Sequence, residues 1–131
     1  MQKISSISKI TGLIFIMLMS SFFSFAQSQQ EIEADTLVDR QEYAGALEIY
    51  NKLIEKSKLK TEEDYQLYFK RAVCYYGLQN FDAALKDVNV LIEKYPQPQA
   101  KLLRAYINQE LEDYEAQLVD LNELIALSPN N

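Results

Sequence analysis

Four acidic residues near position 112 are the side chains whose spacing comes closest to that of a catalytic pair: Glu110, Glu112, Asp113 and Glu115. Two carboxyl groups can divide the roles of general acid and general base when their surroundings separate their pKa values. A small acidic enzyme built on residues 110–115 is therefore one hypothesis. No nucleophile motif or glycine-rich loop accompanies these acids, and Asp113 and Glu115 have a simpler role at the start of a helix. We therefore expect no catalytic residues.

The amino-acid composition removes most other catalytic chemistry. The 131 residues include no His, no Trp, one Cys, three Gly and three Pro. Histidine acid–base catalysis, histidine-ligated zinc and cysteine clusters thus lack their residues. The acids form no calcium loop with oxygen ligands at alternate positions. We expect no metal site and no small-molecule cofactor, and the length allows one domain rather than two.

Two further polar features have simple interpretations. Cys74 is alone, so it cannot form an internal disulfide, and we expect a buried small hydrophobe; an intermolecular bridge is the alternative. The local basic cluster is followed at once by acidic residues, which is typical of a solvated loop rather than a phosphate site. A nucleic-acid partner is therefore not expected. The cluster consists of Lys52, Lys56, Lys58 and Lys60, followed by Glu62, Glu63 and Asp64.

The N-terminus has the pattern of a secretory signal peptide. Lys3 and Lys9 precede an uncharged run over 10–25, and Ser24-Phe25-Ala26 provides small residues before a cleavage site. We predict a signal peptide at 1–26 and an exported domain at 27–131, periplasmic or secreted. An uncleaved membrane anchor at 10–26 is the alternative, and only then would the chain be membrane-bound. Cleavage would remove two lysines and no acid, so the net charge would change from −6 to −8.

The exported part contains internal repeats. Residues 81–97 recur at 114–130 with an offset of 33, and Arg71-Ala72 recurs at the same offset as Arg104-Ala105. A third copy lies 38 residues before the middle one. The recurring identities of the first pair are Ala83/Ala116, Leu85/Leu118, Asp87/Asp120, Asn89/Asn122, Leu91/Leu124, Ile92/Ile125 and Pro96/Pro129. The approximate repeats are 27–60, 61–97 and 98–131.

Each repeat has the pattern of two helices. Apolar residues recur at three- and four-residue spacing within 65–76 and again within 84–95. Thr61 with Asp64 resembles a capping box, Asn80 and Asp113 can cap second helices, and Pro96 can end one. A single hairpin cannot bury its apolar faces, so three must stack. We predict an all-α, right-handed superhelical solenoid; a helical bundle without repeat stacking is the alternative.

The middle repeat resembles the tetratricopeptide repeat family. It presents the residue types of that family's 34-residue pattern at Tyr68, Ala72, Tyr75, Phe81, Ala84, Val88 and Pro96. The third repeat departs from the pattern at Lys101, Asn108 and Gln117, and the first lacks the terminal proline. The resemblance covers 28–131 and identifies the chain as an exported, bacterial-type member.

The resemblance implies a protein-binding groove lined by the first helix of each hairpin. Members that clamp a peptide carboxylate use Lys, Arg and Asn there, but this chain has Glu31, Asp35, Val73 and Leu103 at the matching positions, so the clamp is not expected. The groove would instead be apolar with an acidic entrance. We predict a non-catalytic scaffold that binds an apolar helix or extended peptide, unless these side chains only pack the neighbouring hairpin. The candidates are Phe69, Val73, Tyr76, Leu102 and Tyr106.

The last helix carries a second apolar stripe. Three charged residues of the middle repeat, Lys86, Glu93 and Lys94, correspond to Val119, Ala126 and Leu127. These lie away from the expected core stripe of Leu118, Leu121, Leu124 and Ile125. We predict that residues 118–127 are covered, by a second copy of the chain or by a partner's helix. The terminal-interface candidates are Leu118, Val119, Ala126 and Leu127.

Overall fold

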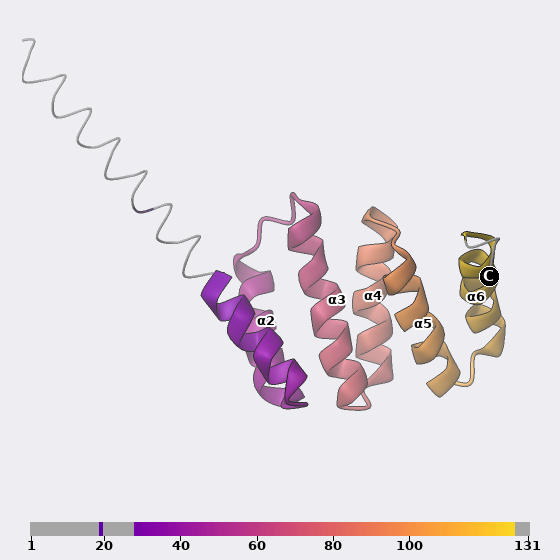
Figure 1. Ribbon diagram of the computed structural model, residues 1–131, viewed down its shortest axis with the longest axis horizontal. Coiled ribbons are helices and arrows are strands. Elements are labelled where there is room, and N and C mark those ends of the chain that lie inside the picture. The colour runs from indigo at the N-terminus through magenta and orange to yellow at the C-terminus, as the bar shows by residue number, and fades with distance from the viewer. Residues whose placement is uncertain (1–18, 20–27, 128–131) are drawn as a thin grey trace, which may run out of the picture.

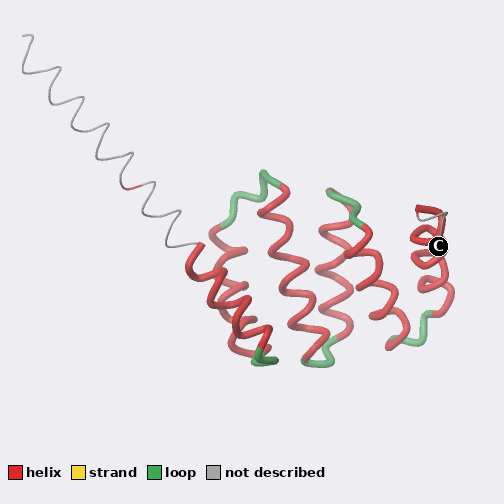
Figure 2. Tube along the Cα trace, viewed as in Figure 1, coloured by secondary structure: helices red, strands yellow, loops and turns green. Residues whose placement is uncertain are grey.

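The computed structural model describes residue 19 and residues 28–127. The described residues form helices joined by short loops (Figure 2). A helix at 28–39, called the N-terminal helix below, is followed by five others. They are α2 (Tyr43–Lys56), α3 (Glu62–Gly77), α4 (Phe81–Lys94), α5 (Pro98–Glu110) and α6 (Tyr114–Leu127). The predicted cleavage site and nearly all of the predicted signal peptide lie outside the described residues.

The helices form three hairpins that stack in chain order along the long axis of the molecule (Figure 1). Helix α3 packs against both α2 and α4, and α5 packs against both α4 and α6. Each hairpin therefore contacts its sequence neighbours, as in a repeat solenoid. The all-α solenoid predicted from the repeats is confirmed, and the unstacked bundle is wrong.

The three hairpin turns have one common geometry. In each turn a residue with positive φ follows the first helix: Gln41 at 62°, Gln79 at 60° and Glu112 at 60°. The next backbone N–H donates to a carbonyl five residues earlier, from Glu42 to Leu37, Asn80 to Tyr75 and Asp113 to Asn108. This is the Schellman motif, which satisfies carbonyls at the end of a helix. The repeat in sequence is thus a repeat of backbone conformation.

The predicted helix boundaries agree with the structure. Thr61 and Asp64 form a reciprocal capping box at the start of α3. The side chains of Asn80 and Asp113 accept from the N–H groups of Ala83 and Ala116, at 3.3 and 3.1 Å, and so cap α4 and α6. Helix α4 ends at Lys94, before Pro96.

The core consists of two apolar clusters. One lies among the N-terminal helix, α2 and α3 and includes Leu53 and Cys74; the other lies among α3, α4 and α5 and includes Val88 and Ile107. Cys74 is fully buried, and burial raises the pKa of its thiol to about 11. It is the buried small hydrophobe that the sequence predicted.

The expected core stripe of α6 is wrong in two of its four positions. Leu118 and Ile125 are 56% and 69% exposed, while Leu121 and Leu124 are partly buried. The equivalent residues of α4, Leu85 and Ile92, pack against the second cluster. The difference arises because α5 lies against α4, whereas no described helix follows α6.

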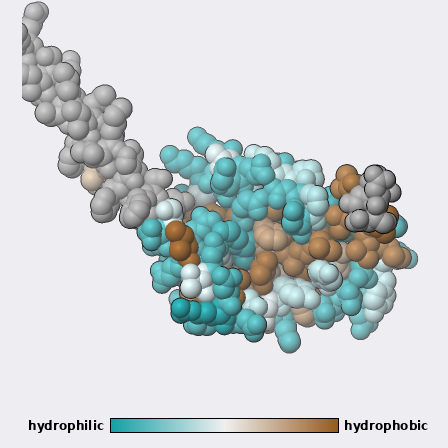
Figure 3. Space-filling view, viewed as in Figure 1, coloured by the Kyte–Doolittle hydropathy of each residue, from teal (hydrophilic) through white to brown (hydrophobic). Residues whose placement is uncertain are grey.

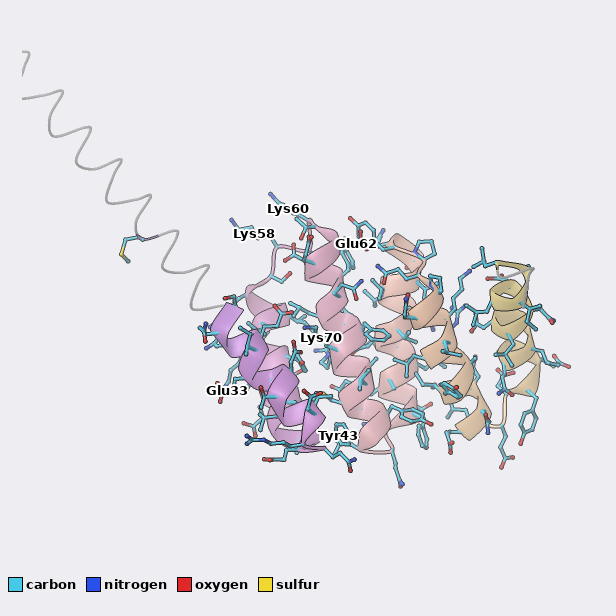
Figure 4. All side chains as sticks on the ribbon, in the orientation of Figure 1. Glu33, Tyr43, Lys58, Lys60, Glu62 and Lys70 are labelled. Atoms are coloured by element: carbon cyan, nitrogen blue, oxygen red, sulfur yellow. The ribbon has the colours of Figure 1, made fainter. Side chains whose placement is uncertain are left out.

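Gly77 provides a test of how tightly the first two hairpins stack. A Cβ atom at Gly77 would lie 2.4 Å from Cε2 of Tyr43, which is labelled in Figure 4. We expect Gly77→Ala to lower the free energy of unfolding by about 1–3 kcal/mol, as overpacking does, when measured by urea denaturation.

Gly45→Ala is the matched control for this substitution. Its Cβ would lie 3.3 Å from Cδ1 of Leu37, an aliphatic side-chain terminus. Because alanine favours a helix interior over glycine by about 0.5–1 kcal/mol, this variant should be neutral or stabilising. Equal destabilisation by both substitutions would contradict the close approach of Tyr43 to Gly77.

Candidate protein-binding surfaces

A cavity of about 370 Å³ lies where the N-terminal helix faces α3. Two predicted groove residues of α3, Phe69 and Val73, line it together with Asp35 and Val38 of the N-terminal helix. The remaining lining residues are Asp39, Tyr50 and Lys70. The first two hairpins thus bring together apolar and acidic side chains from the faces that the sequence had assigned to a groove.

Lys70 occupies the expected acidic entrance of this cavity. Its Nζ lies 2.7 Å from Oε1 of Glu31 and 2.7 Å from Oδ2 of Asp35. Figure 4 shows Lys70 on α3 in the space beside the N-terminal helix. Burial would lower the pKa of this ammonium group, but hydrogen bonds to Asp35 and Glu31 offset that effect and raise it. The one ammonium charge balances only one of the two carboxylates, so this group keeps a net negative charge, and the exposed Asp39 adds a further acid at the cavity.

Asp35 also accepts a hydrogen bond from the hydroxyl of Tyr50. Tyr50 is buried, and this burial, followed by the neighbouring carboxylate, raises the pKa of its hydroxyl well above the ordinary value. Asp35 thus joins the N-terminal helix to α2 and α3. The contact with Lys70 spans 35 residues of sequence, so no local spacing could have indicated it.

The other predicted groove residues lie apart from this cavity. Tyr76 is partly buried against the second core cluster and lines a separate cavity of about 370 Å³ with Tyr43, Gly77 and Glu110. Partial burial and the Glu110 carboxylate raise the pKa of Tyr76. Leu102 and Tyr106 are 40% and 50% exposed on α5. A single continuous groove through all five residues stays a prediction. On the face of the molecule seen in Figure 3, apolar residues gather across the middle and toward α6.

Two arginine clamps join the hairpins to one another. Arg71 on α3 donates from Nε and Nη2 to both carboxylate oxygens of Asp87 on α4, at 2.6 and 2.8 Å. Its Nη1 reaches across to Oδ1 of Asn51 on α2, at 2.9 Å. One guanidinium therefore connects its own hairpin with the preceding one.

The second clamp repeats the first residue by residue. Arg104 on α5 donates to both oxygens of Asp120 on α6, at 2.8 and 2.6 Å, and to Asn89 on α4 at 2.8 Å. The carboxylates of both clamps are almost fully buried, with Asp87 3% and Asp120 1% exposed. These residues recur visibly in the sequence, but their pairing was not predicted. The sequence feature that could have indicated the pairing is the recurrence of both the arginine and the aspartate at the offset of 33.

The acidic residues near position 112 do not form a buried carboxylate pair. Glu110, Glu112, Asp113 and Glu115 are all exposed, and Asp113 is occupied in capping α6. Within 28–127, no group of three potential metal-ligating side chains comes together. The predicted loop is wrong for Lys52 and Lys56, which lie within α2, because the apolar periodicity of that helix continues to its last turn. All four lysines are exposed, and Figure 4 shows Lys58 and Lys60 extending from the α2–α3 connection near Glu62. No helix among the described residues combines the length and apolar character needed to cross a membrane.

Helix α6 exposes the predicted terminal-interface residues. Val119 and Leu127 are 55% and 64% exposed, and Ala126 is also exposed. Together with Leu118 and Ile125 they make an apolar end to the described solenoid. Coverage of this end in the working protein stays a prediction.

Helical hairpins that stack in chain order define a helical-repeat protein. Residues 33–97 match the family model of the tetratricopeptide repeat. A segment of 72 residues, 55% of this chain, is 31% identical to the Intraflagellar transport protein 56 homolog of Caenorhabditis elegans and covers 12% of that protein. The chain is a tetratricopeptide repeat protein, as its middle repeat indicated, and the family match covers the first two hairpins.

The arginine clamp predicts a large cost for removing one partner. Arg71→Met would leave the buried carboxylate of Asp87 without its ion pair, so we expect the free energy of unfolding to fall by about 3–5 kcal/mol in urea denaturation. Lys94→Met is the control, because its pair with Glu93 is exposed and 3.6 Å long. That variant should change the free energy by less than about 0.5 kcal/mol. If Arg71→Met costs no more than Lys94→Met, the clamp contributes nothing.

Proposed function

We propose that this chain is a non-catalytic scaffold that binds an apolar helix or extended peptide of another protein. Membership of the tetratricopeptide repeat family supports a role in protein–protein interaction. The binding mode rests on one observation, the cavity that Phe69 and Val73 line with Val38. A partner's apolar side chain can enter this cavity and displace water from three apolar walls.

The charges around the cavity favour a particular flanking residue. Lys70 balances only one of the two charges of Glu31 and Asp35, and Asp39 is exposed at the same cavity, so the surroundings are acidic. A partner segment with an apolar anchor next to a lysine or arginine would place that cation near Asp39. Leu102 and Tyr106, exposed on α5, extend the apolar contact toward the third hairpin. Rigid aromatic anchors suit such a surface because they lose little conformational entropy on binding.

A random peptide library displayed on phage tests this binding mode, because the selection does not require the natural partner to be identified. We expect the purified protein to select peptides with an apolar anchor beside a basic residue. Phe69→Ala and Tyr106→Ala should each weaken binding of a selected peptide by about tenfold, the effect of truncating an interface anchor.

Leu78→Ala is the control for these variants, since Leu78 is 43% exposed in the turn after α3 and lies outside the cavity. Circular dichroism and the thermal midpoint report whether each variant folds. Unchanged peptide affinity in folded Phe69→Ala and Tyr106→Ala would refute the groove assignment.

We further propose that the scaffold works outside the cytoplasm, in the cell envelope or the secreted space. The charged N-terminus, the uncharged run over 10–25 and the small residues before position 27 support export. A membrane-anchored assembly factor that retains residues 10–26 is the alternative. Both alternatives leave the repeat domain on the same side of the membrane.

N-terminal sequencing of the protein isolated from its own cell tests the export proposal. We expect the mature chain to begin at Gln27, because cleavage follows Ala26, and to be found in the envelope or secreted fraction. A chain that retains residues 1–26 and sediments with membranes would support the anchor instead. A full-length chain in the cytoplasmic fraction would contradict both.

A further inference from the structure

Successive hairpins meet at two joints, α2 against α3 and α4 against α5. Both joints contain a hydrogen bond between an asparagine and an arginine. Asn51 on α2 accepts from Arg71 on α3, and Asn89 on α4 accepts from Arg104 on α5. In each joint the asparagine lies on the second helix of one hairpin and the arginine on the first helix of the next. Asn122 occupies the same repeat position on α6 and is exposed. It receives no such bond from residues 28–127.

The apolar neighbours of Asn122 also correspond to residues that are covered at the joint between α4 and α5. Leu85 and Ile92 flank Asn89 on α4 and pack against the core cluster that includes α5. Their counterparts on α6, Leu118 and Ile125, flank Asn122 and are 56% and 69% exposed. We define the outer face of α6 by Leu118, Asn122 and Ile125. The equivalent face of α2 is covered by α3, and that of α4 is covered by α5.

The two covering helices define what such a face accepts. In α3 the buried residues Leu67 and Cys74 lie four before and three after Arg71. In α5, Ala100 and Ile107 have the same spacing around Arg104 and are also buried. A covering helix thus combines one arginine with apolar residues at positions −4 and +3.

A second copy of this chain does not offer that helix in stacking order. In the N-terminal helix the position equivalent to Arg71, at the offset of 38, is Glu33. Helix α6 carries the exposed Glu115 and no basic residue, while its Glu123 is paired with Lys101 of α5. Glu33 of a second copy would be repelled by Glu115, whereas an arginine would be attracted, so charge complementarity favours a different partner.

We propose that the outer face of α6 docks a helix of a partner protein, and that this helix carries an arginine with apolar residues four before and three after it. The arginine donates to Oδ1 of Asn122, and the apolar residues cover Leu118 and Ile125. The inference rests on the proposed scaffold function but uses a face separate from the Phe69 cavity.

A stapled peptide with the sequence of residues 97–111 is the probe, because this segment contains the helix that covers α4. The staple joins positions 102 and 106, which are exposed in α5, and holds the short peptide helical. Binding to the full-length chain is followed by fluorescence anisotropy. We expect saturable binding that Ile125→Lys weakens at least tenfold.

A double-mutant cycle isolates the proposed hydrogen bond. Asn122→Ala in the protein should weaken the peptide by about five- to tenfold, as should Arg104→Met in the peptide. The two changes together should weaken it no further than either alone. Independent, multiplying losses, or no binding of the unmodified peptide, would overturn the proposal.

Two controls separate this proposal from its alternatives. Phe69→Ala should leave unchanged the part of stapled-peptide binding that Ile125→Lys removes, so failure of the cavity proposal and failure of the α6 proposal are distinguishable. Sedimentation of the unmodified protein should show a monomer. A dimer that Ile125→Lys dissociates would overturn the proposal in favour of a second copy.

Discussion

The stacking of this solenoid depends on two buried carboxylates, each of which requires an ion-pair partner. Asp87 and Asp120 lie inside their hairpins, where an unpaired charge would be costly. Each is met by both donors on one edge of an arginine fork, which holds the guanidinium in one orientation. Nη1 of the same guanidinium then donates to the asparagine of the preceding hairpin. Satisfying the charge within a hairpin thereby fixes how neighbouring hairpins pack.

The two ends of the solenoid differ because the clamp does not extend to them equally. The N-terminal helix has no clamp arginine and is held by the contacts of Asp35 with Lys70 and Tyr50. These contacts form one wall of the cavity that the proposed function uses. At the other end, α6 keeps the asparagine and the apolar flanks of a joint without a described helix against them. Both proposed binding surfaces thus lie where the internal pattern of clamps is interrupted.

Much of the fold could be predicted because each repeat carries its own local signals. Thr61, Asn80 and Pro96 marked helix boundaries that the structure confirms, and the offset of 33 indicated the stacking. The pairing of Lys70 with Glu31 and Asp35 could not be predicted, since it depends on how two hairpins meet. The burial of α6 was overestimated for Leu118 and Ile125, because helical periodicity shows which residues share a face and not what lies against it. The Arg–Asp–Asn clamp was visible only as recurring charged residues.

Native-state hydrogen exchange of the unbound protein tests most directly whether clamped joints hold this solenoid together. Helix α4 is covered on both sides and is clamped through Asp87 and Asn89, whereas α6 is covered on one side and clamped through Asp120. The backbone amides of α4 should therefore open with a higher free energy than those of α6, and Arg71→Met should lower that of α4. Equal protection of α4 and α6 in a monomer, unaltered by Arg71→Met, would contradict the account.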